Sequence, residues 1–107
     1  MSTKGSEDRF QCLDMLRVKW VNDSGKATSE CAIVLEIWSS GAVLQTETAI
    51  REGSILTVAS PSGPVCAKVS TCTPDDYGFL IQMSVDSSEC WFPNSYYPAD
   101  LIPRSAA

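Results

Sequence analysis

Residues 36–41 read Glu-Ile-Trp-Ser-Ser-Gly, and they join two apolar runs of the chain. The run that ends here, Cys31–Trp38, is apolar at most positions, which is typical of a central strand with two apolar faces. Ser39-Ser40-Gly41 interrupts it, and Ala42–Thr46 has the composition of a second strand that leads away. The segment therefore predicts two consecutive strands with a short polar turn between them.

Working outward, the other apolar segments alternate with a period of two, as β-strands do. Tyr77–Val85 follows Val65–Thr71 after the turn signal Pro74-Asp75-Asp76, so these two segments predict a long antiparallel hairpin. We expect Ser60–Pro64, with two prolines and a glycine, to be irregular. No helical period precedes residue 87, so the chain predicts an all-β small domain, a six-stranded antiparallel barrel. The candidate strands are Leu16–Val21, Cys31–Trp38, Ala42–Thr46, Ser54–Ala59, Val65–Thr71 and Tyr77–Val85.

The two ends of the chain differ from this pattern. Residues 1–8 are polar and predict a flexible tail, so the barrel is assigned to residues 9–88. Residues 89–107 are rich in aromatic residues and proline, which predicts a short helical or irregular segment. We expect its aromatic side chains to cover an open end or edge of the barrel. The alternative is an exposed patch that binds a partner.

Bulk composition excludes several classes of protein. A length of 107 residues allows one domain, and a net charge of −5 argues against binding of a nucleic acid polymer. It leaves room for one small anionic ligand held by two or three arginines. No apolar run approaches the roughly 18–20 residues of a membrane span, and the N-terminus lacks a secretory signal. These features predict a cytoplasmic protein without membrane insertion.

The nucleophiles and metal-ligand types are also limited. The chain has five cysteines and no histidine, and no two cysteines form a CxxC pair, so we expect no metal site. Free thiols, several of them buried, are expected in a reducing cytoplasm, with Cys31 in the core. Ser39 and Ser40 lack a recognisable base, and Asp75-Asp76 is typical of a turn rather than of a cation site. The chain is therefore expected to be non-catalytic.

The order of these parts resembles the PilZ domain, a bacterial six-stranded barrel that senses cyclic di-GMP. The resemblance covers roughly Arg9 to Val85 and rests on three pieces in order. They are the acid-to-glycine turn Glu36–Gly41 followed by Ala42-Val43-Leu44, the turn Ile50–Ser54, and the final hairpin. It implies that arginines upstream grip phosphates while the acid and hydroxyl of the turn read guanine edges.

Residue by residue, the match to the PilZ motif is incomplete. Glu36 is one methylene longer than the usual Asp, Trp38 stands in the place of a serine, and Leu13 stands where a second arginine follows Arg9. The candidate ligand-binding residues implied by the resemblance are Arg9, Arg17, Glu36, Trp38, Ser39 and Gly41.

Three functions follow from this comparison. The first is a PilZ-like regulatory module with a degenerate ligand site that acts through a protein partner, without a cofactor. The second is an atypical cyclic di-GMP receptor that uses Arg9, Arg17, Glu36 and Trp38. The third is an unrelated small barrel that binds a peptide or a single strand through its C-terminal aromatics. The direction of Trp38 distinguishes the first two: a core position favours a relic, and an open face beside Arg9 favours a ligand.

Overall fold

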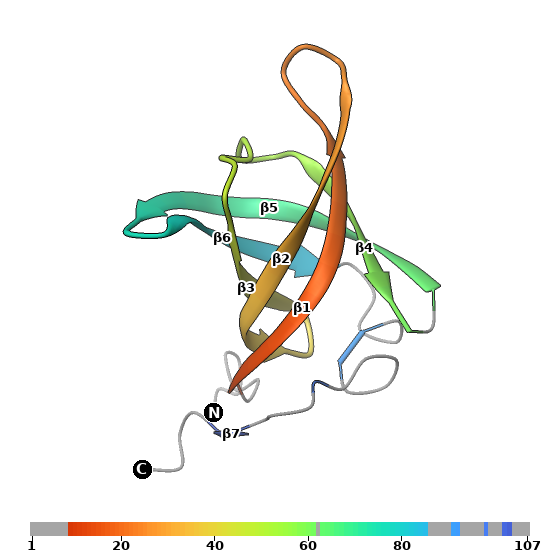
Figure 1. Cartoon of the computed structure of the whole chain (residues 1–107). Coiled ribbons are helices and arrows are strands. Elements are labelled where there is room, and N and C mark those ends of the chain that lie inside the picture. Colours follow the sequence, from red (N-terminus) through yellow and green to blue (C-terminus); the bar gives the residue numbers. More distant parts are fainter. Residues whose placement is uncertain (1–8, 62, 86–90, 93–97, 99–101, 104–107) are drawn as a thin grey trace, which may run out of the picture.

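The computed structural model describes residues 9–61, 63–85, 91–92, 98 and 102–103. These residues form seven strands and no helix, as Figure 1 shows. The strands are β1 (Phe10–Val21), β2 (Ala27–Trp38), β3 (Gly41–Thr46), β4 (Ile55–Ser60), β5 (Gly63–Asp75), β6 (Gly78–Val85) and β7 (Ile102–Pro103).

The six long strands close into an antiparallel barrel, which confirms the predicted fold class. Their order around the barrel is β2-β3-β6-β5-β4-β1, and pairing of β1 with β2 closes the ring. The two-residue strand β7 pairs with the start of β1, where Phe10 lies opposite Pro103. No helix among the described residues has the length and hydropathy that a membrane span requires.

The barrel interior is filled by the inward-facing residues of each strand. Leu16, Val18 and Trp20 of β1 are all buried, as their alternation predicts. Every strand of the ring contributes to this one apolar cluster, so its burial stabilises the barrel as a unit. Its members from the other strands include Val34, Ile37, Leu44, Leu56, Val58, Val65, Val69, Ile81, Met83 and Val85.

The β4–β5 connection corrects the expectation of an irregular segment. Ser60 is the last residue of β4, and Gly63 and Pro64 are the first two residues of β5. Ser60 pairs with Gly63, so the hairpin turns over only two residues. Pro64 is tolerated because, among the described residues, β5 pairs with β6 only from Ala67 onward and has a free edge at Pro64.

The predicted core position of Cys31 is also wrong, and the inward alternation of β5 ends before Thr71. Cys31 is exposed rather than in the core, because the β1–β2 register places it opposite Arg17 on the outer face of the barrel. Thr71 is exposed because a bulge between Val69 and Thr71 shifts the β5–β6 register and ends the inward alternation of β5. Of the four cysteines in the described part of the chain, Cys12 alone is buried.

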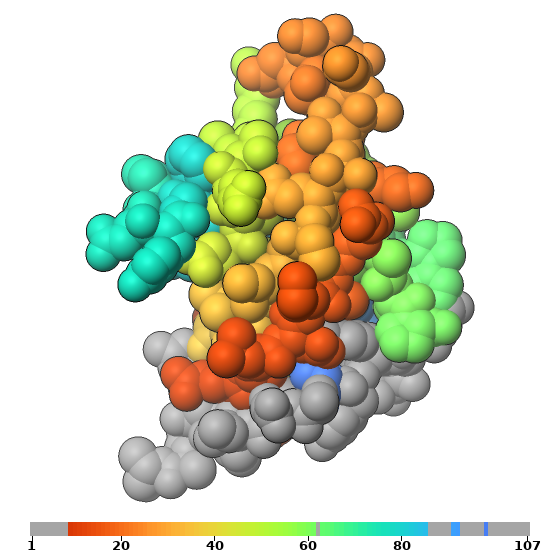
Figure 2. All heavy atoms as spheres, in the orientation of Figure 1, coloured from red at the N-terminus to blue at the C-terminus, as the bar shows by residue number. Residues whose placement is uncertain are grey.

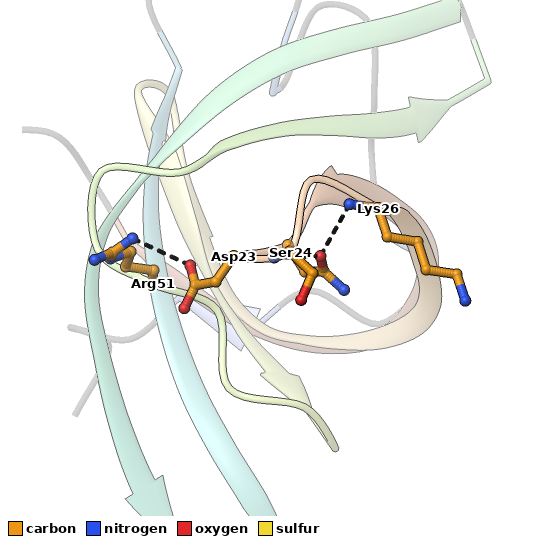
Figure 3. Close-up of polar contacts among 5 residues, drawn as sticks. Asp23, Ser24, Lys26 and Arg51 are labelled. Carbon is orange, nitrogen blue, oxygen red and sulfur yellow. Dashed lines mark hydrogen bonds and ion pairs between the residues drawn. The ribbon is translucent and has the colours of Figure 1, made fainter.

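The predicted turn after β1 is confirmed and is tied to a second loop. Asn22 Oδ1 accepts hydrogen bonds from the backbone N–H of Ser24 at 2.9 Å and of Lys26 at 3.0 Å. Figure 3 shows Asp23 and Arg51 directed toward one another from neighbouring loops, with 3.2 Å between Oδ1 and the guanidinium nitrogen. Both side chains are about three-quarters exposed (76% and 74%), so this ion pair adds little stability.

Candidate functional site

Most of the candidate residues meet where β1 begins and β2 ends. Phe10 lies opposite Ile37 and Gln11 lies opposite Glu36 in the β1–β2 ladder. Arg9 immediately precedes β1, so this register brings it to the end of β2. The sequence pattern placed the first strand from Leu16 onward, whereas β1 extends back to Phe10. That extension creates the contact between Arg9 and the turn.

Arg9, Glu36 and Trp38 form one compact group, called here the Arg9 cluster. The Arg9 guanidinium nitrogen Nη1 lies 3.6 Å from Glu36 Oε1. The guanidinium carbon lies 3.9 Å from the centroid of the Trp38 ring, within the range of a cation–π contact. The Arg9 side chain is 42% exposed, and the Glu36 side chain is only 12% exposed. Arg9 therefore has a carboxylate and a ring as partners within the protein.

The sequence left two positions open for Trp38, one in the core and one on an open face beside Arg9, and the structure shows a feature of each. Its residue exposure is only 4%, yet it is absent from the interior cluster that contains its neighbour Ile37. Because successive residues of a strand point to opposite faces, Trp38 lies on the outer side of the barrel wall. It lies beside Arg9, as the receptor hypothesis requires, but its ring is covered rather than open.

Gly41 is explained by close packing. Its φ angle is not in the positive region, so the turn itself does not demand glycine. A Cβ at this position would collide with the backbone carbonyl of Met83, and it would lie 3.1 Å from the Trp38 ring. The Trp91 Nε1–H donates a hydrogen bond of 3.1 Å to the Gly41 carbonyl. Gly41 thus allows β2, β3 and β6 to approach, with Trp38 and Trp91 against it.

The structure does not bring Arg17 to the Arg9 cluster. Arg17 of β1 lies opposite Cys31, which is five residues before Glu36 on β2, so Arg17 is about 16 Å along the strand from Glu36. Its Nη1 donates to Ser29 Oγ at 3.4 Å. Ser39 does lie near the cluster, half-buried in the two-residue turn between β2 and β3.

Trp91 and Phe92 belong to this end of the barrel, although the candidate residues did not include them. Both are buried, and the Phe92 ring packs edge-on against Phe10 with 5.4 Å between centroids. The expected covering role of the C-terminal aromatics is confirmed for these two residues. Tyr96 and Tyr97 lie outside the described residues. The aromatic density of the C-terminal segment was the available signal, but it did not specify which ring faces the turn.

One thiol near this end of β1, that of Cys12, has a shifted pKa. Burial, with smaller contributions from Asp14 and Glu36, raises the pKa of the Cys12 thiol to about 11. The thiol donates to the Val34 carbonyl, with 3.6 Å between sulfur and oxygen. Cys12 is therefore protonated at neutral pH and unsuited to act as a nucleophile. Within the described residues, no three cysteines or carboxylates gather in a way that could hold a metal ion.

Comparison of the chain with protein-family models, curated proteins and solved structures finds no match. The functional argument therefore depends on the residues and geometry described above.

Proposed function

We propose that the protein is a non-catalytic, PilZ-like regulatory module that acts through contacts with a protein partner. In this proposal the chain is a cytoplasmic bacterial protein of the cyclic di-GMP signalling type. Its ligand site is degenerate, because residues of the protein itself now engage the arginine that would hold the ligand.

The Arg9 cluster is the observation that carries this proposal. Glu36 lies 3.6 Å from the Arg9 guanidinium, so its negative charge opposes the approach of a phosphate to Arg9. Trp38 occupies one face of the same guanidinium. A phosphate would have to compete with both partners. Leu13 stands where the PilZ motif has its second phosphate-binding arginine. Its side chain is 64% exposed and has no group that can donate a hydrogen bond to a phosphate.

The magnitude of the missing contacts supports weak or absent ligand binding. A cyclic dinucleotide carries two negative charges, and each lost charge-assisted hydrogen bond weakens binding by about 1.5–3 kcal/mol. Two such losses correspond to roughly two to four decades in the dissociation constant. The net charge of −5 adds no long-range attraction to compensate.

The alternative, an atypical cyclic di-GMP receptor, is favoured by one observation. Arg9, Glu36 and Trp38 lie together, and the Arg9 side chain remains 42% exposed. In this alternative a guanine base stacks on the exposed part of the guanidinium and donates to Glu36. In this arrangement Arg17 plays no part, because it lies too far along β1.

Calorimetry with cyclic di-GMP at low salt distinguishes the two functions. The degenerate module predicts no saturable heat for the wild-type protein, and saturation in the micromolar range would overturn it. If heat is seen, Arg9→Ala tests the site, with Arg51→Ala as a matched control because Arg51 lies in the loop before β4. A receptor loses binding in Arg9→Ala alone.

A further inference from the structure

A second basic feature lies away from the Arg9 cluster, in a groove between β1 and the β4–β5 hairpin. Its volume is about 320 Å³, and it is lined by Arg17, Lys19, Thr57, Ala59, Ser60, Gly63 and Pro64. The two walls can be followed in Figure 2, where the hairpin (green) stands beside β1 (red to orange).

The groove arises because β1 and β4 separate after a very short ladder. Their paired residues are Val18 with Val58 and Lys19 with Thr57. The next pair in this register would join Arg17 to Ala59, but the ladder ends before it. Beyond that point β4 continues to Ser60 in pairing with β5. The strands thus leave a cleft whose walls are two strand edges, and a strand edge is suited to receive an extended chain.

Charge on one wall and small side chains on the other define what the groove can hold. Arg17 and Lys19 flank the fully buried Val18, so both side chains lie on the outer face and line the groove. Arg17 also donates to Ser29 of β2, and that exposed contact at 3.4 Å leaves its charge without a carboxylate among the described residues. Neither forms an ion pair with a described residue, and none of the described residues that line the groove is acidic. The opposite wall offers Ala59 and Pro64, which leave room for a main chain.

We propose that this groove binds an extended acidic peptide with carboxylates at alternate positions, of the form acid-x-acid. Arg17 and Lys19 are two residues apart on one strand, so their Cα atoms are about 6.5 Å apart. Two carboxylates at positions i and i+2 of an extended peptide have the same spacing, so each cation meets one acid. This inference names the partner chemistry for the proposed interaction module and rests on that proposal.

Other anions fit the groove less well. No aromatic side chain among the described residues lines it, so this part of the chain offers no stacking surface of the kind that single-stranded nucleic acid uses. A protein with a net charge of −5 also repels a long polyanion. A single compact phosphate uses neither strand edge, whereas an extended peptide pairs with the main chain as well as with the two cations.

Fluorescence polarisation with labelled, capped peptides tests the proposal. The probe is a Thr-Glu-Thr-Glu-Thr peptide, and its Thr-Gln-Thr-Gln-Thr counterpart removes only the charges. We expect the glutamate peptide to bind and the double variant Arg17→Gln, Lys19→Gln to bind it about tenfold more weakly, as loss of two exposed ion pairs predicts. Lys68→Gln is the matched control, because Lys68 is exposed on β5 but does not line the groove. It should bind as the wild type does.

A variant that keeps the charges tests the shape of the groove. In Ala59→Leu the larger side chain fills space in the groove opposite Arg17, so the variant should also bind the glutamate peptide about tenfold more weakly. Circular dichroism verifies that each variant remains folded, which is expected because the substituted residues are exposed. Equal binding of the glutamate and glutamine peptides, or undiminished binding by the double variant, would overturn the proposal. Tighter, Arg17-dependent binding of a single-stranded oligonucleotide or inorganic phosphate would show that the ligand class is wrong. None of these results depends on the cyclic di-GMP titration, so failure of the peptide site and failure of the degenerate module are distinguishable.

Discussion

Replacement of Trp91 by alanine tests how far the C-terminal segment belongs to the barrel. Trp91 is fully buried, and its Nε1–H satisfies the Gly41 carbonyl. Truncating a buried tryptophan to alanine typically costs about 3–5 kcal/mol through lost apolar burial and the cavity that remains. The carbonyl also loses its donor. We therefore expect Trp91→Ala to lower the free energy of unfolding by about 4 kcal/mol. This is a large part of the roughly 5–15 kcal/mol that is typical of a small domain.

Urea denaturation at 25 °C followed by circular dichroism measures this effect. With an m-value of about 1.5 kcal/mol per molar, a loss of about 4 kcal/mol lowers the midpoint by about 2.5 M. Trp91→Phe keeps most of the ring and removes the donor, so it should cost about 1–2 kcal/mol. Tyr77→Ala is the matched control, because Tyr77 is 80% exposed and its loss should change stability by less than about 0.5 kcal/mol. A midpoint shift below about 0.5 M for Trp91→Ala would refute the assignment of Trp91 to the core.

Three further predictions concern single sites. Gly41→Ala should destabilise the fold by about 2–3 kcal/mol, because the new methyl group meets the Met83 carbonyl, and thermal denaturation should show a melting temperature lower by about 10 °C. The raised pKa of Cys12 means that its stabilising effect is complete below pH 9 and is lost as pH rises toward 11. Between pH 9 and pH 11 the free energy of unfolding of the wild type should therefore fall by about 2–3 kcal/mol more than that of Cys12→Ala. Equal decreases for the two proteins, measured by urea denaturation, would contradict a buried Cys12 thiol. Asp23→Asn should change stability by less than about 1 kcal/mol, because its ion pair with Arg51 is exposed, and a larger loss on urea denaturation would show that the loop contact matters to the fold.

The alternation of apolar residues was sufficient to predict the barrel, because the inward faces of β1 and β6 follow it without interruption. The signal failed where a bulge interrupts a ladder. In β5 the bulge between Val69 and Thr71 ends the inward alternation. In β1 the inward positions alternate throughout, but Leu13 and Met15 on the outer face are apolar and more than 60% exposed. Because Asp14 holds an inward position between them, the residue types of this part of β1 do not alternate, which hid the first half of the strand from a pattern of period two.

The grouping of the candidate residues depends on the register between β1 and β2, which the sequence pattern did not reveal. Glu36, Trp38 and Gly41 are close in sequence, so their grouping could be predicted from the turn. Their contact with Arg9 requires the pairing of Phe10 with Ile37, which the alternation alone does not specify. The order of residues in the sequence also could not show which of Arg9 and Arg17 contacts the Glu36–Gly41 turn. That choice is determined by the direction of β1 and by the position of each arginine in the β1–β2 ladder.

The most direct test of the proposed degenerate site is a nuclear magnetic resonance titration that observes the Arg9 side chain. With its guanidinium carbon 3.9 Å from the Trp38 ring centroid, Arg9 should have side-chain proton resonances shifted upfield by the ring current. A degenerate site predicts that these shifted resonances stay in place as cyclic di-GMP is added to millimolar concentration. Resonances that start at ordinary positions, or that move and saturate with the ligand, would contradict it.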